Sequence, residues 1–218
     1  MKKILMLTFI VMVSTVTIAQ ISWSVRAGIN LSSFTGLNGQ DKDNLKTKLG
    51  YQFVFGMDYA LNEKFSIQPS LLFITKGARF SYTNQNEKYK ASINPMYIDL
   101  PVLVAYKFYL AEKSKLAISA GPYVAYGNGG KWEREYTSSG VTIKYHKDVF
   151  GNRKEFEAGN VYTDRPIDFG LCTGIALEYH HYLVGINASW GFVKFAGNEY
   201  NNSAVKNVCY SFSTGYIF

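Results

Sequence analysis

Strict alternation of side-chain type near the end of the chain constrains the fold more than any other feature. In residues 208–218 every second position belongs to a mainly aromatic set, namely Val208, Tyr210, Phe212, Thr214, Tyr216 and Phe218. The positions between them are mostly small. Side chains of a β-strand point alternately to opposite faces, so this segment predicts a strand with one apolar face and one small, mostly polar face. Such an edge invites aggregation unless it pairs with another strand in a closed barrel and its apolar face meets lipid.

The same alternation recurs along the chain. It predicts further strands at about 22–31, 50–60, 65–76, 96–109, 116–127, 167–179 and 182–194. The connections between these segments are alternately long and short, so all long connections fall on one side when the two ends of the chain share the other. Outer-membrane barrels have short periplasmic turns and long outer loops in this arrangement. We therefore expect an all-β fold, an eight-stranded antiparallel transmembrane up-and-down β-barrel whose first strand pairs with its last.

The first residues predict export. Lys2 and Lys3 precede an apolar run at 4–18 that ends in small residues, as in a secretory signal peptide cleaved after Ala19. A membrane-anchoring helix is the alternative, but the run is short for one. We expect a signal peptide at 1–19 and one barrel domain at 20–218. Residues after 19 contain no comparable apolar run, so only a closed barrel could cross the membrane.

Charge and cysteine usage limit the partners and cofactors. The chain has 23 Lys and Arg against 16 Asp and Glu, and its net charge is +7. These basic residues lie mostly in predicted turns and loops without an RNA-binding motif, so we expect no nucleic acid partner. Cys172 and Cys209 fall on inward faces of strands separated by one other strand, about 10 Å apart and beyond disulfide reach. We expect free thiols, no metal site and no cofactor.

Polar residues on the inward face form the first candidate site. An eight-stranded barrel is about wide enough to be filled by its own side chains, and buried charges need partners. We expect an internal ion-pair network in which Arg26 meets Asp58, Glu178 or Asp99; a narrow pore is the alternative. The predicted lumen residues are Arg26, Gln52, Asp58, Gln68, Asp99, Lys107, Asp168 and Glu178.

Aromatic residues in the longest connection, 128–165, form the second candidate site. Within it, residues 141–145 predict a small hairpin arm above the membrane. Exposed aromatic residues near Lys and Arg often mark a binding surface, but they could equally pack over the mouth of the barrel. The residues are Trp132, Tyr136, Tyr145, Phe150, Phe156 and Tyr162.

Two other classes of protein need separate consideration. A lipid-modifying hydrolase would need His146 close to a Ser and an acid or amide at the outer rim, because His180 and His181 lie in a predicted periplasmic turn. There is no G-x-S-x-G motif, and we expect no catalytic residues and no enzyme. A soluble lipocalin-like barrel would need the bulky faces inside, where they would overfill a small barrel.

Several segments resemble a known family. Val25–Ser32, Phe65–Leu72, Tyr97–Pro101, Ala120–Tyr123 and Asp168–Leu171 are similar, in this order, to motifs of the PorT-type outer-membrane β-barrel domains of Bacteroidota, small barrels like OmpA and OmpX. Ser70 replaces a Glu that is common in the second motif. The resemblance implies the fold and the outer-membrane location. The family's namesake serves a secretion and gliding system, but no residue of this chain indicates that it has the same role.

These observations predict an outer-membrane barrel with a structural, adhesive or partner-binding role through its outer loops. A narrow channel and a lipid-modifying hydrolase are the alternatives. The expected partners are outer-membrane lipid, an envelope or extracellular partner, and the barrel-assembly machinery. Tyr216 and Phe218 resemble the terminal aromatic signal that this machinery recognises. We expect a monomer.

Overall fold

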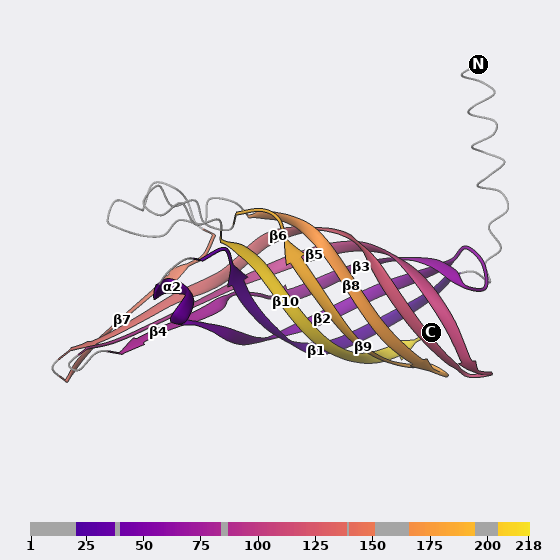
Figure 1. Ribbon diagram of the computed structural model, residues 1–218, viewed down its shortest axis with the longest axis horizontal. Helices are drawn as coiled ribbons and strands as arrows, with labels where there is room; N and C mark the ends of the chain where they lie inside the picture. The colour runs from indigo at the N-terminus through magenta and orange to yellow at the C-terminus, as the bar shows by residue number, and fades with distance from the viewer. Residues whose placement is uncertain (1–20, 38–39, 84–86, 139, 151–165, 195–204) are drawn as a thin grey trace, which may run out of the picture.

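The computed structural model describes residues 21–37, 40–83, 87–138, 140–150, 166–194 and 205–218, which contain ten strands of one antiparallel sheet and one short helix (Figure 1). The predicted signal peptide, 1–19, lies outside these ranges. The elements are β1 (Ile21–Thr35), α2 (Gln40–Asp43), β2 (Leu45–Ala60), β3 (Phe65–Thr75), β4 (Ala78–Thr83), β5 (Glu87–Ala111), β6 (Ser114–Ser138), β7 (Val141–Asp148), β8 (Ile167–Tyr179), β9 (Tyr182–Gly191) and β10 (Lys206–Ile217).

Strand pairing closes the sheet into a ring. Neighbouring pairs run β1–β2, β2–β3, β3–β5, β5–β6, β6–β8, β8–β9 and β9–β10, and β10 returns to β1. At the seam Val25 lies opposite Tyr216 and Ile29 opposite Phe212. The predicted pairing of the first and last strands is therefore confirmed, and it satisfies both edges that would otherwise be free.

The predicted strand number was wrong, because the described residues contain ten strands rather than eight. The additional strands, β4 and β7, fall in the connections 77–94 and 128–165 that the sequence predicted as loops. The same connections contain the first part of β5 and the last part of β6. Each of these two strands is 25 residues long in total. These segments are rich in charged and polar residues, so the apolar periodicity of a lipid-facing strand is absent although the backbone pairing continues.

Apolar side chains point outward from the ring and polar side chains point inward. Phe53 on β2 is 56% exposed and Leu100 on β5 is 54% exposed, whereas their sequence neighbours Gln52 and Asp99 are 2% and 4% exposed. The bulky faces are outside, which argues against the lipocalin-like arrangement. Among the described residues, no helix has the length and hydropathy needed to cross a membrane.

The two ends of the ring differ. One end, here called the turn end, holds Ile21, Phe218 and the short connections 61–64, 112–113 and 180–181. At the opposite end the sheet extends beyond the ring (Figure 1). We call this extension the arm; it comprises residues 45–47 of β2, β4, 87–96 of β5, 129–138 of β6, and β7. β7 forms the hairpin predicted around residues 141–145.

Candidate functional site

Polar side chains line the turn-end half of the lumen. Asp58 accepts hydrogen bonds from Lys107 Nζ at 2.7 Å, Gln68 Nε2 at 2.6 Å and Ser66 Oγ at 3.0 Å. The ion pair satisfies the charge of a largely buried carboxylate. Arg26 and Glu178 line the same cavity of about 90 Å³. Asp58 and Asp99, two of the three predicted partners of Arg26, each form an ion pair with a lysine instead. The Nε atom of Arg26 has no hydrogen bond among the described residues.

A second cluster closes the arm-end half of the lumen. Lys76, which directly follows β3, forms an ion pair with Asp99 at 2.6 Å, and both side chains are at most 5% exposed. The Lys76 ammonium lies 5.0 Å from the ring centre of Tyr97 and 4.7 Å from that of Tyr123. Such distances allow cation–π attraction. The predicted residue Asp99 is thus held by a lysine that the sequence analysis did not single out.

Asp168 joins this cluster through Tyr123. Its Oδ2 accepts hydrogen bonds from Tyr123 Oη and Asn207 Nδ2, each at 3.0 Å. The sequence analysis missed Lys76 and Asn207 as lumen residues. Lys76 has the same parity as the inward Leu72 and Ile74, which is a signal that could have placed it in the lumen.

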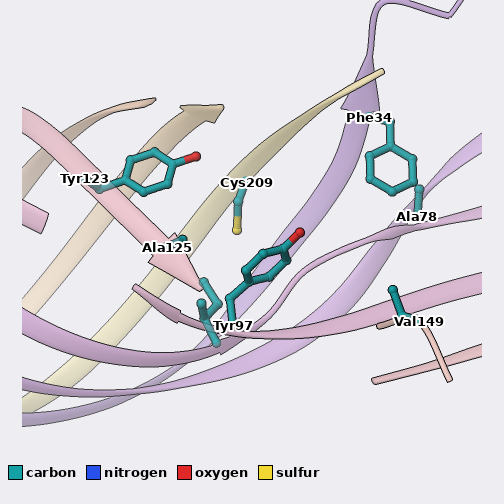
Figure 2. Close-up of a cluster of buried hydrophobic side chains, with 8 residues drawn as sticks. Phe34, Ala78, Tyr97, Tyr123, Ala125, Val149 and Cys209 are labelled. Atoms are coloured by element: carbon teal, nitrogen blue, oxygen red, sulfur yellow. The ribbon is translucent and has the colours of Figure 1, made fainter. Parts of the chain in front are cut away.

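An apolar layer covers this cluster toward the arm. Figure 2 shows Tyr97, Tyr123 and Cys209 directed into one space, with Phe34, Ala78 and Val149 further along the interior. Phe150 packs against the same layer, 5.6 Å from the ring centre of Tyr97. Together, the polar, aromatic and apolar side chains fill the lumen at this end.

The predicted loop aromatics separate into two groups. Phe150 lies over the lumen, and a Cβ added at Gly127 would collide with its ring. Trp132 and Tyr136 on β6 and Tyr145 on β7 lie on the arm, and of these Trp132 also packs against the interior cluster. Phe156 and Tyr162 fall outside the described residues.

Cross-strand pairing places the arm aromatics on one face. Residues directly opposite each other in adjacent antiparallel strands share a face of the sheet. On β5, every second residue along this face leads to Tyr97, which points into the lumen. We therefore call this side the inner face of the arm. Its three rows are Tyr82–Tyr89–Tyr136–Ile143, then Leu45–Phe80–Ala91–Arg134–Tyr145, then Thr47–Ala78–Ile93–Trp132–Lys147.

The inner face combines exposed rings with positive charge. Tyr145 is 63% exposed and Tyr82 is 45% exposed. The Arg134 guanidinium lies 3.7 Å from the ring centre of Trp132, which fixes both side chains by a cation–π contact. Tyr136 Oη donates to Glu87 Oε1 at 2.6 Å, and this hydrogen bond raises the pKa of the Tyr136 phenol.

The opposite, outer face of the arm is charged. Lys46 lies directly opposite Arg79, which is followed across the sheet by Ser92, Glu133 and His146. Since Glu133 separates His146 from Ser92, the two lie two strand spacings apart, about 10 Å. This spacing prevents the Ser–His contact that the hydrolase alternative requires of this pair.

The remaining predicted residues lie away from the arm. Tyr216 contacts His181 and Phe218 at ring-centre distances of 5.3 Å each, and Phe218 N donates to Trp23 O at 2.8 Å. Cys172 and Cys209 lie on β8 and β10 with Ser189 of β9 between them, and both are free, as predicted. In the part of the chain that the structure describes, no three His, Cys, Asp or Glu side chains are grouped to hold a metal.

A ring of antiparallel strands with apolar side chains outside and a packed polar interior defines a membrane-spanning β-barrel. The chain belongs to the outer membrane protein beta-barrel domain family, whose model matches residues 17–216. Membership places the protein in the outer membrane. The family match is broader than the PorT-type family to which the sequence motifs are similar.

The chain is also similar to solved outer-membrane structures. The attachment invasion locus protein Ail of Yersinia pestis is 11% identical, with 90% of this chain and 98% of that chain covered and a TM-score of 0.38. Neisserial surface protein A is 12% identical, with coverage of 89% and 96% and a TM-score of 0.39. The outer membrane enzyme PagL is 13% identical, with coverage of 90% and 98% and a TM-score of 0.39. No curated protein sequence matches the chain significantly.

Proposed function

We propose that this protein is a closed outer-membrane barrel that anchors a rigid aromatic surface for a protein partner outside the membrane. The observation that supports it best is the inner face of the arm, where three cross-strand rows bring together Tyr82, Tyr89, Trp132, Tyr136 and Tyr145 with Arg134. Tyr, Trp and Arg are the residues most enriched at the energetic centres of protein interfaces.

The arm is suited to present this surface because it continues the barrel. About 9–11 residues of a tilted strand cross a membrane, whereas β5 and β6 each have 25. Their ladder runs from Glu87 paired with Ser138 to Ala111 paired with Ser114, with a register shift where the arm meets the ring. A surface on paired strands loses less conformational freedom on binding than one on a flexible loop.

Site-specific photo-cross-linking tests the proposal with a matched pair of positions. A photoreactive residue replaces either Tyr145 on the inner face or the adjacent Lys144 on the outer face, in whole cells. We expect a discrete protein adduct from position 145, none from position 144, and loss of the adduct when Tyr89 and Tyr136 become Ser. Equal adducts from both positions, or none from position 145, would contradict the proposal.

The lumen supports an anchor better than a channel. The Lys76–Asp99 pair and the rings of Tyr97 and Tyr123 occupy its arm-end half, and Phe150 packs over them. We expect a planar bilayer containing the purified protein to show no conductance steps. Regular steps that scale with protein insertion would favour the channel alternative.

The narrower identity belongs to the same proposal. We infer that the chain is a PorT-type barrel of Bacteroidota that acts as a monomer and is inserted by the barrel-assembly machinery. The support is the set of five ordered motifs, of which Tyr97–Pro101 contributes Tyr97 and Asp99 to the packed lumen. Its envelope partner would be the protein captured from position 145.

A further inference from the structure

The outer face of the arm concentrates positive charge at its base. Lys46 and Arg79 lie directly opposite each other on β2 and β4, where like charges repel. Lys48, two residues further along β2, is 9% exposed, and its Nζ donates to Ser92 Oγ at 2.9 Å. Three cationic groups and one hydroxyl therefore meet at this corner of the sheet.

Acidic residues on the same face do not balance this cluster. Glu135 lies between Lys90 and Lys144, and Asp148 lies opposite Lys131, so these carboxylates have basic neighbours of their own. Only Glu133, one strand beyond Ser92, remains on the row of Lys46 and Arg79. Among the described residues, neither Lys46, Lys48 nor Arg79 forms an ion pair within 4.0 Å. With Lys88 on β5, the face thus has seven basic and three acidic side chains and an excess of four positive charges.

A groove runs along this face. Its volume is about 710 Å³, and basic side chains outnumber acidic ones in its lining. They are Lys46, Arg79, Lys90, Lys131, Arg134 and Lys144 against Glu133 and Glu135, and Tyr145 also borders the groove. Uncompensated cations beside an open groove favour an anionic ligand, because the ligand replaces their mutual repulsion with attraction.

The position of the groove identifies the kind of anion. On β5, every second residue along the outer face leads to Met96 and Leu100, which face lipid. Met96 is 41% exposed. Ser92 lies four residues beyond Met96, which is about 13 Å along a strand and about 9 Å along the membrane normal at a tilt of about 45°. The headgroup layer of each leaflet is about 5–8 Å thick, so the flexible Lys46 and Arg79 side chains lie within reach of it.

We propose that the outer face at the base of the arm binds phosphate groups of lipid headgroups in the outer leaflet, with Lys46 and Arg79 as the principal ligands. Lys48, which is buried and held by Ser92, adds positive charge nearby. A soluble polyanion could satisfy the same charges, but it would not require the groove to continue the lipid-facing side of the barrel. Contact with the headgroups would also hold the arm at a fixed angle to the membrane. The proposal depends on the outer-membrane location and not on the protein partner of the inner face.

Native mass spectrometry of the full-length protein tests the proposal. The protein is released from micelles that contain equal amounts of lipid A, a bisphosphorylated glycolipid, and zwitterionic phosphatidylcholine. The test variant is Lys46→Gln with Arg79→Gln. The control is Lys64→Gln with Lys113→Gln, which removes the same charge from exposed positions at the turn end. Both variants retain Lys48, so neither leaves a new buried vacancy.

We expect the wild-type protein and the control to retain lipid A in preference to phosphatidylcholine. The Lys46/Arg79 variant should lose roughly 10- to 30-fold in relative retention, since each basic residue near an anionic surface contributes about fivefold. Equal retention by the two variants would overturn the proposal. Stronger binding of a soluble heparin oligosaccharide than of lipid A would also overturn it, as would displacement of lipid A by millimolar inorganic phosphate.

Cross-linking from position 145 separates this proposal from the proposed function. If the Lys46/Arg79 variant loses lipid A but keeps the position-145 adduct, the headgroup site is supported independently. If wild-type cells give no position-145 adduct while the Lys46/Arg79 variant alone loses lipid A, the proposed function fails and the headgroup site stands. If the adduct forms but the Lys46/Arg79 variant retains lipid A as the control does, the headgroup site fails and the proposed function stands. Each result therefore bears on one face of the arm.

Discussion

Replacing Lys76 with Met would test whether the lumen is a packed and charge-balanced interior. Lys76 is the cation that faces two carboxylates in the arm-end half, its partner Asp99 at 2.6 Å and the nearby Asp168, which is bonded to Tyr123 and Asn207. Met preserves most of the volume of the lysine stem and removes the charge. Asp99 would then be a buried carboxylate without a cationic partner.

The expected loss is large because the pair is shielded from water. At about 4 Å between charge centres and an effective dielectric constant of about 20, the attraction is about 4 kcal/mol. Removing one member of a buried ion pair typically costs about 3–5 kcal/mol, and the contacts with Tyr97 and Tyr123 are lost as well. We expect the free energy of unfolding to fall by about 3–5 kcal/mol for Lys76→Met. Adding Asp99→Asn should restore at least about 1 kcal/mol, because the unpaired charge is removed.

Urea titration of the protein refolded into phosphatidylcholine vesicles, followed by tryptophan fluorescence, would measure these differences. Lys107→Met is the matched control, because its pair with Asp58 is more exposed and Asp58 keeps hydrogen bonds from Ser66 and Gln68. Its cost should be smaller. A loss below about 1 kcal/mol for Lys76→Met, or one no larger than that of Lys107→Met, would refute a charge-balanced interior.

Three further predictions concern the mouth, the seam and the thiols. Gly127→Val should displace the Phe150 ring and lower stability by about 1–3 kcal/mol in the same titration, and Phe150→Ala should remove most of that effect; an unchanged midpoint would contradict this packing. Tyr216→Ala with Phe218→Ala should reduce the heat-modifiable, assembled fraction on gels, because ring contacts at the seam are lost; normal assembly would count against their role. Cys209, which is 3% exposed, should resist maleimide in the folded protein and react after denaturation; rapid labelling of the folded protein would show that the interior is open.

Much of the barrel could be predicted from the sequence because a lipid-facing strand has a simple pattern. Outward side chains such as Phe53 and Leu100 must be apolar, inward ones such as Gln52 and Asp99 need not be, and the period of two fixes both faces. The same rule predicted β8 at 167–179, the seam between β1 and β10, and the separation of Cys172 from Cys209.

The arm could not be predicted in the same way because neither of its faces lies along its length against the hydrocarbon core of the membrane. Tyr89, Arg134 and Lys144 lie in a regular ladder, but a mixture of aromatic, basic and acidic residues has no apolar period to reveal it. The sequence named Trp132, Tyr136 and Tyr145 as binding candidates from residue type alone. Only the cross-strand register joined them to Tyr82 and Tyr89, and placed Phe150 over the lumen instead.

The sequence by itself thus determined the class of fold, the faces of the ring strands and the residue types of the lumen, since these follow from alternation along each strand. Tertiary structure decided which charges meet. Lys76 pairs with Asp99, Lys107 pairs with Asp58, and Lys46 faces Arg79 without a carboxylate between them. Pairing depends on the register between strands that are distant in the chain, and a single sequence carries no periodic signal for that register.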